Sequence, residues 1–333
     1  MSRDRLQALG LNLPPLATSS VGSFPKPEPV QEGRRRFARK QMTQKELLGL
    51  EREATEFWVR TQEELGLDVL VDGEQYRGDM VAYFAELMPG FKTGGLVRSY
   101  GNRYYRKPVI VGEVSWPGPM TVEWWKWTQS LTSKPVKGML TGPYTVMDWS
   151  FNEHYPHRAA TCLALARELR KEVEALVEAG AKIIQIDEPA LSVRPSELPL
   201  VVEGMQILTD GLPAYFVNHA CYGAFEAIYP GLLELPSHNL DLAISQSALD
   251  LLEVFSKHPF TKDLSVGVLD VHSHVIETPE QVNARVKRAL EVLPPDRIWV
   301  DPDCGLKTRS VEEARAKLEV MMTVVRELRR TPA

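Results

Sequence analysis

The sequence predicts an α/β fold, a (β/α)8 TIM barrel, and three observations carry this prediction. From residue 136 onward, short apolar runs alternate with amphipathic helical stretches. Across the chain there are eight such runs, at least five of them followed by a convincing helix, as an eightfold barrel requires. No Gly-x-Gly-x-x-Gly follows the first run, which disfavours the alternative, an open doubly wound sheet. The strands are expected near residues 18–22, 68–72, 136–140, 182–186, 214–218, 240–244, 265–271 and 297–300.

The N-terminal elements are justified by turn and cap signals. The first strand runs into Gly22-Ser23, where a glycine allows close backbone approach to a ligand carboxylate; an ordinary strand-to-loop turn is the alternative. Thr43 to Glu46 reads as a capping box, so a helix is expected to begin there and end at Gly66. A charged loop, 73–79, then follows the second strand.

Residues 85–130 interrupt the alternation and are predicted to form an inserted hairpin or lid, with a strand at 109–114. Four tryptophans, Trp116, Trp124, Trp125 and Trp127, gather in this insertion. They are interpreted as local core rather than a ligand platform. Further helices are expected over residues 159–179, 201–208, 248–255, 279–293 and 311–329.

Composition narrows the class of protein. With 333 residues, 44% hydrophobic and 25% charged, the chain has the make-up of a globular protein, expected to form one catalytic barrel over residues 1–333. A net charge of −5 gives no basic footprint for nucleic acid, and the basic run 34–40 is interpreted as a solvated helix face. No apolar run approaches the ~20 residues that span a bilayer. Three cysteines make no disulfide framework, so a cytoplasmic protein is expected.

Three residues predict a metal site. His219 and Cys221 follow one predicted strand, and Cys304 follows the last one. Because the carboxyl ends of all barrel strands meet at one rim, these side chains are expected to meet there. Two thiolates and an imidazole suit zinc. The alternative is that both cysteines are small buried hydrophobic side chains.

Two carboxylates at the same rim suggest an amino-acid ligand. Glu74 and Asp187 follow two other predicted strands. They could hold an ammonium group while the amides of Gly22-Ser23 hold a carboxylate. Surface salt bridges are the alternative for both carboxylates.

With these residues assembled, the sequence closely resembles the catalytic C-terminal domain of cobalamin-independent methionine synthase over nearly its whole length. Many separate stretches carry the resemblance. They are Val21-Gly22-Ser23-Phe24-Pro25, Asp72-Gly73-Glu74 with Asp79-Met80-Val81, the run from Lys134 to Pro143, the run from Gln185 to Leu191, His219-x-Cys221-Tyr222, Asp270-Val271-His272-Ser273, and Asp301 to Arg309.

The resemblance implies methyl transfer to the thiol of homocysteine, forming methionine. It implies one Zn²⁺ per chain on His219, Cys221 and Cys304, and homocysteine held by Val21, Gly22, Ser23, Glu74 and Asp187. His272 would be the general acid/base, and Trp149 would flank the methyl donor. The family's N-terminal folate-binding barrel has no counterpart here, so a single-domain core form is expected.

Two positions depart from the family pattern. Ala243 stands where the family supplies a glutamate ligand to zinc, which leaves three protein ligands and an open position. Ser192-Val193 replaces an Arg-Glu pair whose glutamate contacts the pterin. From this second departure, together with the missing N-terminal barrel, we expect methylcobalamin or a methyl-corrinoid protein, rather than a folate, as donor.

Two other functions remain open. A zinc-thiolate alkyltransferase acting on another thiol, similar to epoxyalkane:coenzyme M transferases, would share the His-x-Cys…Cys site. Coenzyme M has no ammonium group, however, so it would not need both Glu74 and Asp187. A non-catalytic barrel that binds zinc or an amino acid is the other alternative.

Overall fold

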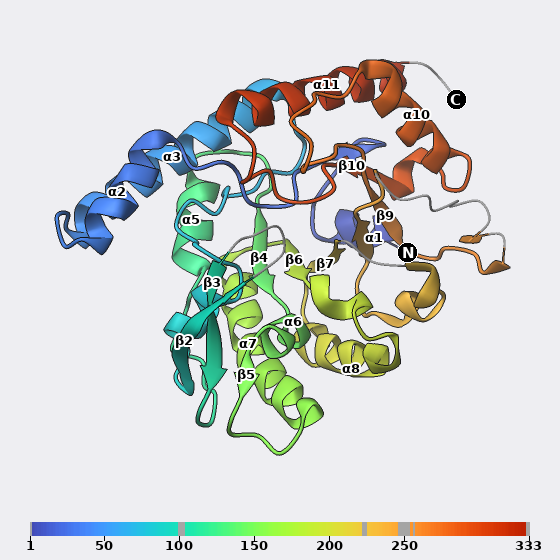
Figure 1. Ribbon diagram of the computed structural model, residues 1–333. Coiled ribbons are helices and arrows are strands. Elements are labelled where there is room, and N and C mark those ends of the chain that lie inside the picture. The colour runs from blue at the N-terminus through green and yellow to red at the C-terminus, as the bar shows by residue number, and fades with distance from the viewer. Residues whose placement is uncertain (1, 99–103, 222–224, 246–253, 256, 331–333) are drawn as a thin grey trace. The chain divides into compact units, whose positions relative to one another are not determined.

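The computed structural model describes residues 2–98, 104–221, 225–245, 254–255 and 257–330, shown in Figure 1. Seven strands form a parallel sheet in the order β1-β10-β9-β8-β7-β6-β4. These strands are β1 (Ala17–Thr18), β4 (Lys137–Thr141), β6 (Ile183–Asp187), β7 (Tyr215–Ala220), β8 (Asn239–Leu242), β9 (Asp263–Gly267) and β10 (Ile298–Asp301). Neighbours in the sheet follow chain order, and the first strand pairs with the last, Ala17 opposite Trp299. The predicted (β/α)8 barrel is therefore confirmed.

The second predicted strand, 68–72, is reduced to a single bridge. Leu70 pairs with Val136 in parallel fashion, and the amide of Val69 donates to Thr18 O at 3.0 Å. This segment therefore takes the eighth position of the barrel, between β1 and β4. It does not extend into a ladder because the side chain of Gln62 binds both the N–H and the C=O of Val71, at 3.0 and 2.9 Å.

The chain divides into two compact units. The first comprises Met1–Tyr76, Trp124–Lys137 and Asn239–Ala333. Its helices are α1 (Ser2–Ala8), α2 (Glu28–Ala38), α3 (Gln44–Leu65), α10 (Pro279–Leu290) and α11 (Val311–Arg330), with α5 (Val122–Ser130) beginning just before the second segment. Helices α10 and α11 pack side by side (Figure 1). The predicted capping box at Thr43 and Glu46 is present, and Gly66 ends α3 with φ of 84°. The predicted helix 248–255 falls largely outside the described residues.

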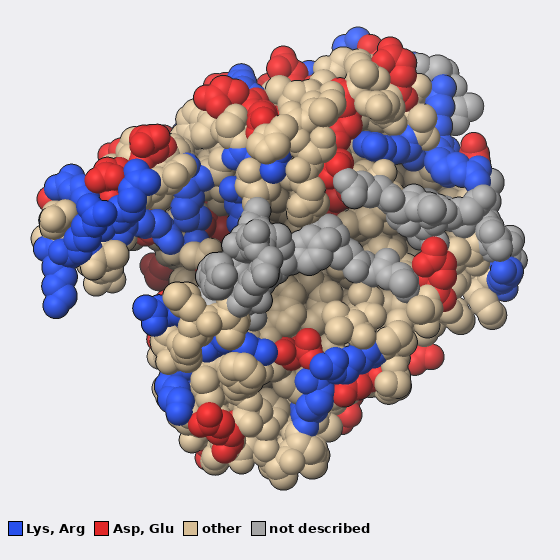
Figure 2. All heavy atoms as spheres, viewed as in Figure 1, with Lys and Arg blue, Asp and Glu red and all other residues tan. Residues whose placement is uncertain are grey.

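The basic run of the first unit belongs to α2 and the residues just after it. Arg35, Arg36, Arg39 and Lys40 are exposed. Figure 2 shows Lys and Arg side chains gathered over this helix. Arg35 also lies 2.8 Å from Glu32 on the same helix. Arg34 is the exception, since it is half-buried and donates to Glu51 Oε1 and Gln75 O at 2.8 Å. The rest of the run is solvated, as the sequence predicts.

The second unit comprises Arg77–Glu123 and Gly138–His238. Its helices are α4 (Ala82–Leu87), α6 (Pro143–Asp148), α7 (Arg158–Ala179) and α8 (Leu198–Thr209). The insertion contains an antiparallel hairpin of β2 (Phe91–Arg98) and β3 (Tyr104–Ile110), with β5 (Phe151–Asn152) parallel to β3. The hairpin strand thus ends at Ile110, whereas the sequence predicts it over 109–114.

A buried carboxylate anchors part of the insertion onto α7. Glu172 is fully buried and accepts hydrogen bonds from Trp116 Nε1 at 2.8 Å and from the Thr121 amide and hydroxyl at 2.7 and 2.8 Å. Trp116 therefore contributes to local structure through its indole N–H.

Among the described helices, none is long and apolar enough to cross a membrane.

Candidate metal centre and substrate site

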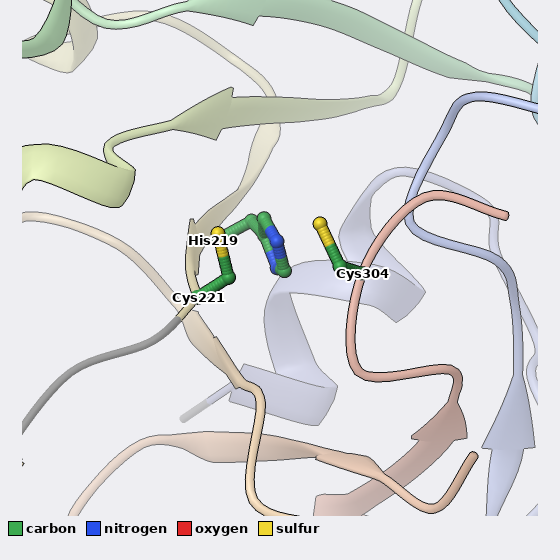
Figure 3. A group of neighbouring side chains, drawn as sticks. All are labelled: His219, Cys221 and Cys304. Atoms are coloured by element: carbon green, nitrogen blue, oxygen red, sulfur yellow. The ribbon is translucent and has the colours of Figure 1, made fainter. Parts of the chain in front are cut away.

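His219, Cys221 and Cys304 form a group with the chemistry of a metal site. His219 lies on β7, Cys221 directly follows that strand, and Cys304 lies in the loop after β10. One ligand atom from each residue lies within 4.8 Å of the others, and Figure 3 shows the three side chains directed toward one another. His219 and Cys221 are buried, and Cys304 is half-buried. Two thiols and an imidazole at this spacing fit a soft, tetrahedral cation such as zinc.

The third cysteine has a different environment. Cys162 on α7 is fully buried, and this burial raises the pKa of its thiol far above the ordinary value. Cys162 thus behaves as a small hydrophobic residue, which is the alternative that the sequence left open for the other two. Within the described residues, the metal group consists of His219, Cys221 and Cys304 and includes neither Glu74, Asp187 nor His272.

The predicted Gly-Ser turn lies against the loop of Cys304. Val21 and Ser23 are buried, and Ser23 O accepts a hydrogen bond from the amide of Leu306 at 2.7 Å. A Cβ on Gly305 would lie 2.0 Å from Ser23 Oγ, so a larger residue beside Cys304 would have to displace the Ser23 hydroxyl. On its other side, the turn bonds to the next loop, with the Phe24 amide donating to Gly73 O at 3.0 Å.

Glu74 lies in an unusually constrained turn. Its φ of 52° is in the left-handed region, which non-glycine residues adopt rarely. Its amide donates to Asp72 Oδ1 at 2.9 Å, and its carbonyl accepts from Lys26 Nζ at 3.1 Å. Burial, with a smaller contribution from the nearby Arg34, lowers the pKa of Lys26 to about 8. Glu74 itself is only 9% exposed, so it is no surface salt-bridge residue.

Asp187 ends β6 directly beside the metal group. It is paired in the ladder with His219 and is buried, and its Oδ1 accepts a hydrogen bond from Gln185 Nε2 at 2.7 Å. Burial again argues against the surface alternative.

Glu188, which was not among the predicted site residues, is fully buried next to Asp187. It accepts from the amides of Tyr144 and Thr145 at 3.0 and 2.7 Å and from the Thr145 hydroxyl at 2.6 Å. Burial raises the pKa of Glu188 to about 7, against the opposing effect of these hydrogen bonds. Its carboxylate thereby fixes the start of α6. The signal that could have revealed it is the adjacent acidic pair within the Gln-Ile-Asp-Glu-Pro stretch.

The two residues assigned to chemistry and donor binding are more open. His272 is exposed in the turn after β9, where its amide donates to Asp270 Oδ1 at 2.8 Å. Trp149 is half-buried at the C-terminal end of α6, with its amide bonded to Thr145 O at 3.0 Å. Ala243 follows β8 and is half-buried. Residues 246 and 247 of that stretch, and Tyr222 beside Cys221, lie outside the described residues.

Comparison with known proteins places these residues in a family. The family model for the catalytic domain of cobalamin-independent synthase matches residues 16–327. A 5-methyltetrahydropteroyltriglutamate–homocysteine methyltransferase from Xylella fastidiosa strain M23 is 42% identical over 339 residues, covering 98% of this chain and 45% of its own length. The corresponding Corynebacterium glutamicum strain R protein is 38% identical, with 98% and 46% covered. The chain thus spans about half the length of the curated relatives it matches.

Solved structures agree with the fold. A B12-independent methionine synthase from Shewanella sp. W3-18-1, in complex with selenomethionine, has a TM-score of 0.84 at 26% identity, over 95% of this chain and 98% of that one. A protein from Listeria monocytogenes described as a putative vitamin-B12 independent methionine synthase has a TM-score of 0.77 at 18% identity, over 95% and 99%, and supports the fold alone.

These relatives overturn the expectation of a methylcobalamin donor or methyl-corrinoid partner. The family is described as cobalamin-independent, and the relatives are named for a methyltetrahydropteroyltriglutamate substrate. The expectation rested on Ser192-Val193, of which Val193 is 58% exposed to solvent, and on the lack of a counterpart to the family's N-terminal barrel. The match of the family model across residues 16–327 shows that the chain belongs to the cobalamin-independent methionine synthase family and contains its catalytic domain.

Proposed function

We propose that this protein is a methyltransferase that methylates the thiol of homocysteine to form methionine, and that residues 1–333 act as one catalytic barrel. The observation that carries the proposal is the group of His219, Cys221 and Cys304, with ligand atoms within 4.8 Å of one another. Family membership supports the reaction, and the names of the relatives support the thiol substrate.

The metal we assign to this group is a single Zn²⁺. Zinc, when bound, lowers the pKa of a coordinated thiol while leaving its sulfur nucleophilic. Three protein ligands leave room for the sulfur of homocysteine. Because a free thiol has a pKa near 8.5, most homocysteine would otherwise be protonated and unreactive at neutral pH.

Homocysteine also carries an ammonium and a carboxylate, and both need partners. We assign the carboxylate to the backbone of Val21, Gly22 and Ser23, and the ammonium to Glu74 and Asp187. The burial of both acidic side chains supports this assignment, since a carboxylate held away from bulk water interacts more strongly with a cation. The hydrogen bonds that hold the turns of Ser23 and Glu74 would keep these groups fixed before substrate arrives.

The methyl donor we propose is a 5-methyltetrahydropteroyl-glutamate, the class named for the relatives. The homocysteine sulfur attacks the methyl carbon, the S–CH₃ bond forms as the N5–CH₃ bond breaks, and N5 takes up a proton. We assign delivery of that proton to His272, whose exposed turn leaves its ring accessible. Trp149, half-buried at the end of α6, is assigned to flank the donor.

A donor-by-thiol matrix tests the proposal. Purified protein with measured zinc content is given methyltetrahydropteroyl mono- or triglutamate, or methylcobalamin, each with homocysteine or coenzyme M. Methionine from a folate donor and homocysteine, lost in Cys304→Ser, is the expected result. Product formed with methylcobalamin but with neither folate would refute the proposed methyl donor. Alkylation of coenzyme M but not of homocysteine would refute the proposed thiol substrate. Absence of turnover with every pair, with homocysteine still bound, would favour the non-catalytic alternative.

A second arm tests the chemical roles separately. We expect His272→Gln to lower kcat more than KM, because it affects proton delivery, and Asp187→Asn to raise the KM for homocysteine. Zinc content should remain near one per chain in both variants. Loss of zinc from either would mean that the residue supports the metal centre instead.

A further inference from the structure

The residue before Cys304 makes contacts that the proposed mechanism does not use. Asp303 is 5% exposed, and both of its carboxylate oxygens are bonded to one residue, Ser245. Oδ1 accepts from the Ser245 amide at 2.9 Å, and Oδ2 accepts from the Ser245 hydroxyl. Ser245 lies in the loop after β8, whereas Asp303 lies in the loop after β10. The pair therefore joins two loops that are 58 residues apart in sequence.

The strand between these two loops ends in a glycine that leaves space for Asp303. In the sheet, β9 lies between β8 and β10, and Gly267 is its last residue. A Cβ on Gly267 would lie 2.2 Å from Asp303 Oδ1 and 2.8 Å from its Cα, so no other residue fits there without displacing Asp303. The Asp303 amide also donates to Leu269 O at 3.0 Å. Asp303 is thus held on its side chain and its backbone by the ends of two neighbouring strands.

We infer that Asp303 is a positioning residue that fixes the thiolate of Cys304, and that Ser245 is the contribution of the β8 loop to the metal centre. The inference rests on the proposed zinc site. At Ala243, two residues before Ser245, this chain has a methyl group that cannot bind metal. The loop after β8 instead acts on the metal group indirectly. Its Ser245 is hydrogen-bonded to Asp303, and Asp303 is joined to Cys304 by a peptide bond. Groups that orient a ligand from behind commonly change metal affinity 10- to 100-fold when removed.

Four variants separate positioning from general stability and from charge. Asp303→Ala removes both hydrogen bonds. Asp303→Asn removes the charge but can keep both bonds, since its oxygen accepts from the amide and its NH₂ donates to the hydroxyl. Ser245→Ala removes the hydroxyl bond alone. The matched control is Asp68→Asn, which alters a carboxylate of the same unit that is bonded to Thr18 at 2.8 Å, away from the Cys304 loop.

The measurements need no substrate. Zinc affinity is obtained by competition with a chromophoric chelator, the Co²⁺-loaded protein reports the thiolate–metal absorption, and thermal unfolding is followed on the same samples. We expect Asp303→Ala to bind zinc about 10- to 100-fold more weakly, with a shifted Co²⁺ spectrum. Ser245→Ala should show a smaller loss and Asp303→Asn affinity close to wild type. Asp68→Asn should lose stability but not zinc affinity.

A double-mutant comparison completes the test. In the Asp303→Ala background, Ser245→Ala should have no further effect, because the bond is already absent. Unchanged zinc affinity in both Asp303→Ala and Ser245→Ala would overturn the inference, as would equal losses in Asp303→Asn and Asp303→Ala, which would point to charge alone. If Asp303→Ala does not fold, the zinc affinity of Ser245→Ala decides, and an unchanged affinity in that variant overturns the inference. A wild-type chain that binds no zinc would overturn the metal centre itself, a separate and recognisable failure.

Discussion

Lys317 and Glu277 form an ion pair in the protein interior. Lys317 Nζ lies 2.8 Å from Glu277 Oε2, and the lysine side chain is fully buried on α11. Lys317 also donates to Val275 O at 2.6 Å, and the other oxygen of Glu277 accepts from the Asp270 amide at 2.7 Å. The pair therefore ties α11 to the loop after β9, the loop that carries His272.

Removing the lysine should leave the buried carboxylate without its nearest counter-charge, since among the described residues only Arg285 Nη1, 3.8 Å from Oε1, would remain. We expect Lys317→Met to lower the free energy of unfolding by about 3–5 kcal/mol, measured by urea denaturation. The matched control is Arg315→Met on the same helix, whose pair with Glu64 at 3.0 Å is exposed on both sides. That variant should lose less than about 1 kcal/mol. Equal losses of unfolding free energy in the two variants would contradict the prediction that the buried pair stabilises the fold more than the exposed pair.

The pKa of about 7 for Glu188 predicts a pH dependence of stability. Because its folded pKa lies above the ordinary value near 4.5, the unfolded chain releases its proton first as pH rises. The contribution of this group is complete below pH 4.5 and is lost as pH rises through 7. The loss amounts to about 3 kcal/mol between those limits. The difference in unfolding free energy between wild type and Glu188→Gln should change by this amount between pH 4.5 and 8, and a constant difference would refute it.

Gly142 packs directly against the carboxylate of Glu188. A Cβ at this position would lie 2.2 Å from Glu188 Oε1, so Gly142→Ala must displace the carboxylate that holds the start of α6. We expect a loss of about 1–3 kcal/mol in unfolding free energy. The control is Gly49→Ala in α3, where a Cβ would meet nothing within 4 Å. That change should be neutral or should stabilise by up to about 1 kcal/mol, because alanine is the better helix former.

Local signals predicted the elements that they directly specify. The capping box at Thr43 and the helix end at Gly66 were found where the sequence indicated, and seven of the eight apolar runs overlap observed strands, although those expected over 18–22 and 265–271 are shorter in the structure. The 68–72 segment was overestimated because the side chain of Gln62 replaces its ladder partner, a tertiary interaction that no local pattern reveals.

The candidate site shows the same division. His219, Cys221 and Cys304 could be predicted together because parallel strands of a barrel end at one rim. The roles of Glu188, Asp303 and Lys317 could not, since each acts through a partner 40 to 58 residues away and no spacing rule connects such pairs; only for Glu188 does the adjacent acidic pair give a local signal. The methyl donor was wrongly inferred because the departure at Ser192-Val193, together with the missing N-terminal barrel, was taken to exclude a folate, whereas the relatives that match nearly the whole chain are named for a methyltetrahydropteroyltriglutamate substrate.

Replacing Ala243 tests whether a side chain from the loop after β8 can bind the metal directly. It follows β8 at the position where the family places a glutamate ligand, and it is half-buried. We expect Ala243→Glu to supply a fourth ligand and to tighten zinc binding by about tenfold, which corresponds to about 1.4 kcal/mol. Ala243→Gln is the matched control, because an amide of the same shape is a much poorer zinc ligand and carries no charge. Chelator competition measures both variants, and stoichiometry should stay at one zinc per chain. If glutamate and glutamine have the same effect, the β8 loop does not reach the metal, and its influence must pass through Ser245 and Asp303 alone.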